Sequence, residues 1–150
     1  MKEIKIEINN TVLNKYYSYY FAHHPRAKKL PIEHPYHPSI NVWFVMQRPQ
    51  MNALKQKWKD FTIWLIKDLK LNNMQIEYFD MECIVYMPTK RRIDPDNTTP
   101  KFLNDGLVES GFIVDDDGTH MKSLTLRTGY DKDNPRTEIY IRPHEEKEKK

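Results

Sequence analysis

Hydrophobic and polar residues alternate in four segments of the chain, a pattern typical of β-strands with one buried face. These segments are residues 2–8, 75–87, 123–130 and 137–142. The second is the longest, and it places Phe79, Met81, Cys83 and Val85 on the same side. Two short apolar runs, residues 40–45 and 112–114, predict further strands.

A three- and four-residue spacing of apolar positions predicts an amphipathic helix over residues 50–71. Its apolar positions are Met51, Leu54, Trp58, Phe61, Leu65 and Leu69. A second helix is predicted over residues 100–110, because Thr99 suits its cap, Pro100 its first position and Gly111 its end. Residues 14–38 are dense in Tyr, His, Pro and Lys without a sustained period, which favours a long loop.

The order of these segments predicts an α+β fold, in which helices pack on one face of a mixed β-sheet. A chain of 150 residues suits a single domain, which we place over residues 1–144. The charged end, residues 145–150, is expected to form a flexible tail.

Composition narrows the class of protein. The chain is 39% hydrophobic and 30% charged, as in ordinary globular proteins, and no apolar run reaches the length of a membrane span. The first residues lack the apolar block of a secretory signal, and the single cysteine, Cys83, lies in an apolar alternation typical of a buried thiol. We therefore expect a cytoplasmic protein.

Charge is distributed unevenly along the chain. Residues 1–75 contain twelve Lys and Arg against five Asp and Glu, whereas residues 76–150 contain twelve against sixteen. Such a division suits a protein that binds an anion with one part and a cation with another, although ordinary variation of surface charge produces the same counts.

The segment after residue 90 carries candidate metal ligands. Asp94 and Asp96 are two residues apart, so in an extended segment their carboxylates point the same way and repel each other unless a cation lies between them. A helix over residues 100–110 followed by an extended return brings Asp116 back to the level of Asp96. Carboxylate oxygens suit Mg²⁺ or Mn²⁺, and Lys101 in the first turn of the helix would stabilise a phosphate.

Each acidic motif also has an ordinary structural interpretation. Asp-Pro-Asp-Asn is good turn chemistry, and Asp-Asp-Asp-Gly is typical of a solvated loop. A calcium EF-hand loop is excluded, because no glycine lies at the sixth position after Asp94 or Asp131. Asp105 either pairs with Lys101 across the helix surface or supports the metal site from outside.

The spacing of these residues resembles the RusA-type Holliday-junction resolvases. The matching positions are Arg92, Asp94, Asp96, Asn97, Lys101, Asp105, Leu107, Gly111, Phe112, Asp115 and Asp116. The resemblance implies a RusA-like homodimer with Mg²⁺-dependent endodeoxyribonuclease activity on four-way DNA junctions, acting in recombination and repair and often encoded by phages or prophages. It also implies that Asp94, Asp96 and Asp116 bind the metal, with Mn²⁺ able to substitute, and that Lys101 is the catalytic lysine.

Other positions carry secondary roles under the same resemblance. Asn97, Asp105 and Asp115 are outer-shell or alternate metal ligands, and Lys101 follows Asn97 by four residues where the family more often has three. The segment Asn14-Lys15-Tyr16-Tyr17 resembles the asparagine–basic–aromatic segment that follows the family's first strand. Residues expected to contact DNA are Lys90, Arg91, Arg92, Lys15, Lys28 and Lys29.

Several alternatives stay open. His23, His24, His34 and His37 suggest zinc, but their spacing among prolines without cysteine favours loop geometry. The tyrosines of residues 16–20 suit stacking on unpaired bases or packing in a core or dimer interface. The rival functions are a non-catalytic DNA-binding protein of the same fold, another metal-dependent phosphodiesterase on branched DNA, and a phage interaction module.

Overall fold

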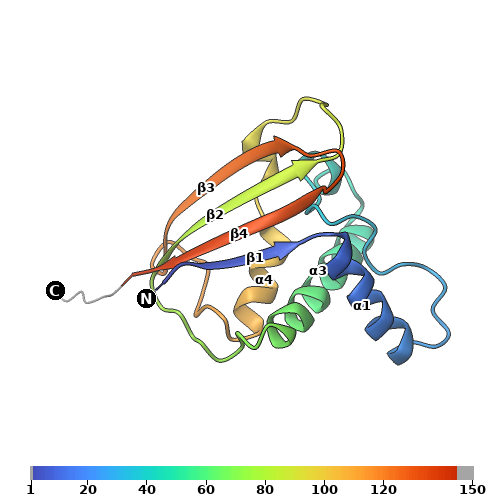
Figure 1. The fold of residues 1–150 in the computed structure, drawn as a ribbon, viewed down its shortest axis with the longest axis horizontal. Coiled ribbons are helices and arrows are strands. Elements are labelled where there is room, and N and C mark those ends of the chain that lie inside the picture. The colour runs from blue at the N-terminus through green and yellow to red at the C-terminus, as the bar shows by residue number, and fades with distance from the viewer. Residues whose placement is uncertain (1, 145–150) are drawn as a thin grey trace.

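The computed structural model describes residues 2–144, which form a four-stranded mixed sheet with helices packed against one face (Figure 1). The α+β class predicted from the sequence is confirmed. The strands are β1 (Ile4–Ile8), β2 (Phe79–Met87), β3 (Met121–Tyr130) and β4 (Arg136–Pro143). The helices are α1 (Asn10–His23), α2 (Ile40–Trp43), α3 (Arg48–Asp68), the 3₁₀ helix η1 (Pro95–Thr98) and α4 (Lys101–Glu109).

The sheet has the order β1-β4-β2-β3, so β2 and β4 are its central strands. The alternation in β2 is the one that the sequence predicts: Phe79, Met81, Cys83 and Val85 are all at most 1% exposed on the helix-covered face. Burial also raises the pKa of the Cys83 thiol to about 12, which keeps it protonated at neutral pH. The buried thiol is thus confirmed.

β2, α4 and β3 form a parallel strand–helix–strand unit. β2 pairs in parallel with β3 along its whole length, and α4 is the helix that carries the chain back from the end of β2 to the start of β3. β4 then pairs antiparallel with the other side of β2. The strands predicted at 123–130 and 137–142 are therefore present, but they are not neighbours, because β2 lies between them.

The helices α3 and α4 pack closely beneath the sheet, as their apolar spacing predicts. A Cβ atom at Gly106 in α4 would lie 2.4 Å from the Cβ of Thr62 in α3. Only a residue without a side chain allows this approach. Phe61 and Ile66 of α3 and Phe102 and Leu107 of α4 are almost fully buried at the same core.

In two segments the predicted local structure differs from the observed one. Residues 14–23 of the segment predicted as a long loop over residues 14–38 belong to helix α1, which Asn9 caps by accepting a hydrogen bond from the Val12 N–H, and which buries Leu13 and Tyr16, whereas residues 24–38 contain neither helix nor strand. The aromatic residues of α1 surround the helix and obscure the period. The apolar run at 40–45 forms the single turn α2 instead of a strand, and it leaves Phe44 75% exposed.

The ends of α4 differ in how well the sequence predicts them. Gly111 follows the helix with φ of +86°, the left-handed conformation that favours glycine, as predicted. At the other end, Pro100 and not Thr99 occupies the capping position, and no side chain of the cap residue bonds the helix. The strand predicted at 112–114 is reduced to a single parallel bridge between Ile76 and Ile113.

Two further expectations concern the membrane and the chain end. Within residues 2–144, no helix has both the length and the apolar character that crossing a membrane requires. The charged tail predicted at residues 145–150 lies outside the described residues.

Candidate functional site

Buried contacts fix the amino-terminal end of α4, where the sequence places its candidate acids and lysine. Phe102, in the first turn, is 1% exposed and packs against the rings of Trp43 and His37, with centroids 5.4 and 5.3 Å away. The Nε2 atom of His37 accepts the Phe102 N–H at 3.0 Å. A side chain sixty-five residues away thus satisfies one of the free N–H groups at the helix start.

Asp94, Asp96 and Lys101 lie together on an exposed segment in front of this anchor. Asp94 occupies the position before η1, Asp96 lies in its first turn, and Lys101 begins α4. All three side chains are exposed, whereas Thr98 between them is 1% exposed and its hydroxyl donates to the Pro95 carbonyl at 2.6 Å. The segment is therefore anchored while its charged groups face solvent.

A second acidic group forms around Asp116. Its N–H donates to an Asp115 carboxylate oxygen at 2.7 Å. Partial burial raises the pKa of Asp116, and the hydrogen-bonded and charged Asp115 and the charge of Asp105 raise it further. Asp105 contacts Lys55 of α3 at 3.9 Å, so its basic neighbour is on the adjacent helix. The Asp105–Lys101 pairing considered from the sequence is not formed within the described residues.

The chemistry of these donors suits a hard divalent cation, but their placement does not assemble a site. Among residues 2–144, no three or more His, Cys, Asp or Glu side chains are grouped so that they could bind a metal ion. Asp94 and Asp96 follow the carboxyl end of β2, whereas Asp115 and Asp116 precede the amino end of the parallel strand β3. Loops at these two positions leave a parallel pair at opposite ends, which separates the acids (Figure 1).

The return path that was expected to close the site is shorter than predicted. Only residues around Ile113 are extended, and a turn follows in which Asp117 accepts hydrogen bonds from the Thr119 and His120 backbone. The charge of Asp105 acts on the Asp116 carboxyl, which places Asp116 nearer to Asp105 than to the start of α4. Asp105 lies one helical turn, roughly 6 Å, further along α4 than Lys101.

The outer ligands implied by the resemblance divide between the two groups. Asn97 lies in η1, and its N–H donates to the Asp94 carbonyl at 2.9 Å, so it supports the first acidic group. Asp105 and Asp115 belong to the group around Asp116.

The basic residues expected to contact DNA also lie in two places. Lys90, Arg91 and Arg92 are exposed immediately before the first acids; Lys90 lies over the Tyr130 ring, and Arg92 approaches Asp94 at 3.6 Å. Lys15, by contrast, lies on α1 and pairs with Asp68 at 2.8 Å. Lys28 and Lys29 are exposed in the loop after α1.

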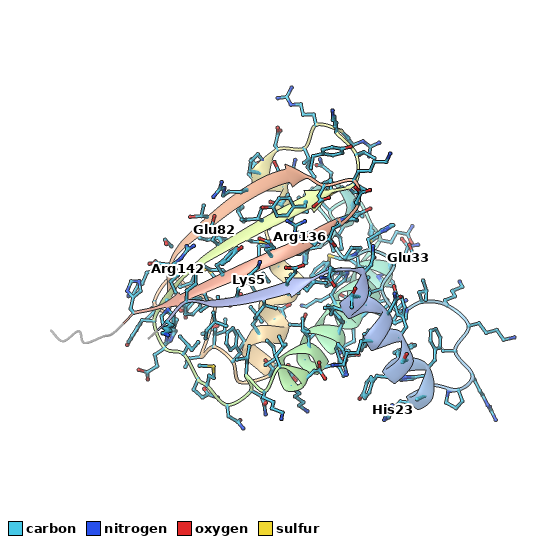
Figure 2. All side chains as sticks on the ribbon, viewed as in Figure 1. Lys5, His23, Glu33, Glu82, Arg136 and Arg142 are labelled. Atoms are coloured by element: carbon cyan, nitrogen blue, oxygen red, sulfur yellow. The ribbon has the colours of Figure 1, made fainter. Side chains whose placement is uncertain are left out.

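The uncovered face of the sheet carries further arginines, but each already contacts a carboxylate. Arg142 and Arg127 bond to Glu82 at 2.8 and 3.0 Å, and Arg136 bonds to Glu138 and Asp131, each at 2.7 Å. Figure 2 shows Lys5, Glu82, Arg136 and Arg142 spread over this face. Because its charges are paired, this face is a poor phosphate-binding surface.

His37, one of the histidines considered for zinc, has a role that the sequence does not predict. It is 3% exposed, its Nδ1 bonds the Pro38 carbonyl at 2.8 Å, and burial lowers its pKa to about 3. The ring is therefore neutral, with a proton on Nδ1 and an acceptor at Nε2. Nothing in the local sequence indicates this role, since the partner lies on a distant helix.

No protein-family model and no curated protein sequence matches this chain. The likeness to RusA-type resolvases therefore depends on the residue spacing alone.

Proposed function

We propose that this chain is a Mg²⁺-dependent endonuclease that cleaves four-way DNA junctions in recombination and repair, like the RusA-type resolvases that its motif resembles. The observation that carries the proposal is the exposed Asp94, Asp96 and Lys101 on an anchored segment at the start of α4. An acid pair beside a lysine and a helix amino terminus suits a phosphate group with a bound cation.

The basic residues beside this segment form a surface that can contact the phosphates of the proposed DNA substrate. Lys90, Arg91 and Arg92 are exposed and adjacent to the acids, and phosphate contacts dominate the affinity of proteins for DNA. A homodimer would place two such sites on opposing strands of a junction, which is itself close to two-fold symmetric.

The proposal requires movement. Asp116 is its third metal ligand, and the acids do not form a metal-binding group in the described residues. The segments around Asp96 and Asp116 must therefore approach each other when DNA and cation bind.

The test is cleavage of a labelled synthetic junction with and without Mg²⁺. Wild-type protein is expected to make paired nicks only with the cation, and Asp96→Asn is expected to bind the junction without cleaving it. Asp133→Asn is a matched control, because Asp133 is an exposed aspartate in the turn between β3 and β4. Cleavage that survives in Asp96→Asn would contradict the proposal.

A comparison of substrates separates the proposal from other phosphodiesterases. Equal cleavage of junction, flap and linear duplex would replace junction resolution with a less selective activity. Replacing both Arg91 and Arg92 by Glu should reduce the slope of log affinity against log salt by about 1.8, since each duplex phosphate contact contributes roughly 0.9. An unchanged slope would remove these two residues from the interface.

A second candidate is a non-catalytic DNA-binding protein. The absence of an assembled three-ligand group among residues 2–144 favours it. It predicts that the purified protein binds the junction but makes no nicks with either Mg²⁺ or Mn²⁺.

A further inference from the structure

A cleft of about 620 Å³ is lined by residues of α1, of α3 and of the loop that follows α1. Its volume is in the range of small-ligand sites. The residues that line it include Tyr19 and Tyr20 of α1, His24 directly after α1, and Lys57, Trp64 and Lys67 of α3. The proposed cleavage site uses none of them.

Aromatic rings form a continuous wall of this cleft. The Trp64 ring lies 5.1 Å from Tyr16 and 6.0 Å from Tyr19, and Tyr20 stacks on His24 at 4.2 Å. Tyr16 is buried and belongs to the core, whereas Tyr19 is 43% exposed and Trp64 is partly exposed. The His23 ring lies against Tyr19, with centroids 4.2 Å apart, so a planar ligand can stack only on the part of the Tyr19 and Trp64 rings that is exposed.

The charges in the cleft favour a negatively charged ligand. Of its two aspartates, Asp68 pairs with Lys15 at 2.8 Å, whereas Asp60 accepts from the Gln56 amide at 2.8 Å, which is neutral and does not offset its charge. One uncompensated carboxylate therefore stands against two lysines. Lys57 and Lys67 are exposed, and no carboxylate of residues 2–144 lies within ion-pair distance of either.

A ligand that matches both features is planar, aromatic and anionic. Nucleotides have this combination, because every base has a face for stacking and every phosphate carries negative charge. The second oxygen of Asp60 is not used by Gln56, so it can accept a hydrogen bond from a base N–H.

We propose that the cleft between α1 and α3 binds a nucleotide, with its base against Tyr19 and Trp64 and its phosphate beside Lys57 and Lys67. The nucleotide is either free or part of a single strand. This site is separate from the proposed cleavage site and does not depend on it.

The test follows tryptophan fluorescence in the presence of a single-stranded oligothymidylate or of free thymidine monophosphate, with Asp96→Asn protein to prevent cleavage. A saturable quench is expected with at least one of the two, since a stacked base quenches Trp64. Quenching by both at similar affinity identifies a free-nucleotide site, and quenching by the oligonucleotide alone identifies a strand site.

Two variants and a matched control connect the signal to the cleft. Trp64→Leu should weaken binding at least five-fold, measured by polarisation of labelled ligand, because each stacked base contributes substantially. Lys57→Gln with Lys67→Gln should weaken it and, for the oligonucleotide, reduce the salt slope by about 1.4. Lys122→Gln with Lys132→Gln makes the same charge change at two exposed lysines outside the cleft.

The proposal is overturned if neither ligand binds, if Trp64→Leu binds as tightly as its parent, or if the two lysine pairs give equal affinity and salt slope. Circular dichroism and melting temperature establish that each variant is folded. Loss of junction cleavage in Asp96→Asn does not affect these outcomes, so the two proposals fail separately.

Discussion

Replacing His37 by phenylalanine tests the anchor that fixes the start of α4. The substitution keeps an aromatic ring between Trp58 and Phe102, whose centroids lie 5.4 and 5.3 Å from the imidazole. It removes the Nε2 acceptor, which leaves the buried Phe102 N–H without its partner. At pH 8 we expect a loss of about 2 kcal/mol in the free energy of unfolding, the usual effect of an unsatisfied buried donor.

The same contact makes stability depend on pH with a definite sign. The pKa of His37 is lowered from 6.5 to about 3 in the folded state, because burial opposes the charged ring. The unfolded chain therefore binds a proton below pH 6.5 that the folded chain does not, so the stability contributed by the neutral ring is present above pH 6.5 and lost as the pH falls. Between pH 8 and pH 5, linkage gives a loss of about 2 kcal/mol for this one group.

The two effects together predict that the free energies of unfolding of wild type and His37→Phe become similar as the pH falls. The variant should be less stable at pH 8 and nearly equal to wild type at pH 5, because it lacks the group that titrates. Urea unfolding, followed by tryptophan fluorescence at several pH values, measures both curves. His34→Phe changes an exposed histidine and should follow the wild-type pH dependence. If His37→Phe runs parallel to wild type from pH 8 to pH 5, His37 is not a buried neutral acceptor.

Two other predictions concern packing and the sheet surface. Gly106→Ala should lower the free energy of unfolding by about 2 kcal/mol, because a collision of about 3 kcal/mol exceeds the gain of about 1 kcal/mol in helix propensity. Thr62→Gly removes the Cβ that lies 2.4 Å away, so in a double-mutant cycle Gly106→Ala should cost less in the Thr62→Gly background. Gly118→Ala, with nothing within 4 Å, is the control and should be neutral. A neutral Gly106→Ala would refute the close packing of α3 and α4. Glu82→Gln should cost about 1–2 kcal/mol at pH 7, since hydrogen bonds from Arg142 and then Arg127 lower the pKa of Glu82 below 4.5. That stability is present above pH 4.5 and lost below it, so the difference should shrink at pH 3, and a difference that does not shrink would refute the pairing.

The parts of the fold that the sequence predicts are those in which local pattern and burial agree. β2 and α3 are long and keep a constant period, so Phe79 and Phe61 are assigned to the core from spacing alone. The pattern fails where side chains of one kind surround an element, as in α1, and where a short apolar run has no buried face, as at Phe44. The position of β2 between β3 and β4 depends on long-range pairing, which no local period encodes.

The candidate site shows the same division. Lys101 in the first turn of α4 and the exposed Asp94 and Asp96 follow from helix signals and turn chemistry. The capping of α4 by His37 cannot be predicted from local sequence signals, because it joins a loop to a helix across sixty-five positions. Element lengths predict that Asp116 converges with Asp96 only if the chain returns from α4 fully extended, and the extended part ends near Ile113.

If the acids are to meet around a cation, the structure indicates which segment moves. η1 is held by the buried Thr98 and packs against β3, so its displacement would disturb the core. None of residues 114–120 is buried, and hydrogen bonds alone hold the turn at Asp116: Val114 donates to the Ile76 carbonyl, Asp117 accepts from Thr119, His120 and Met121, and the His120 ring bonds the Glu77 carbonyl. Between those points Asp116 has a raised pKa, since partial burial and neighbouring carboxylates disfavour its charged form. A cation would relieve that unfavourable charge, so the proposed mechanism requires the turn to move toward η1 while η1 stays in place.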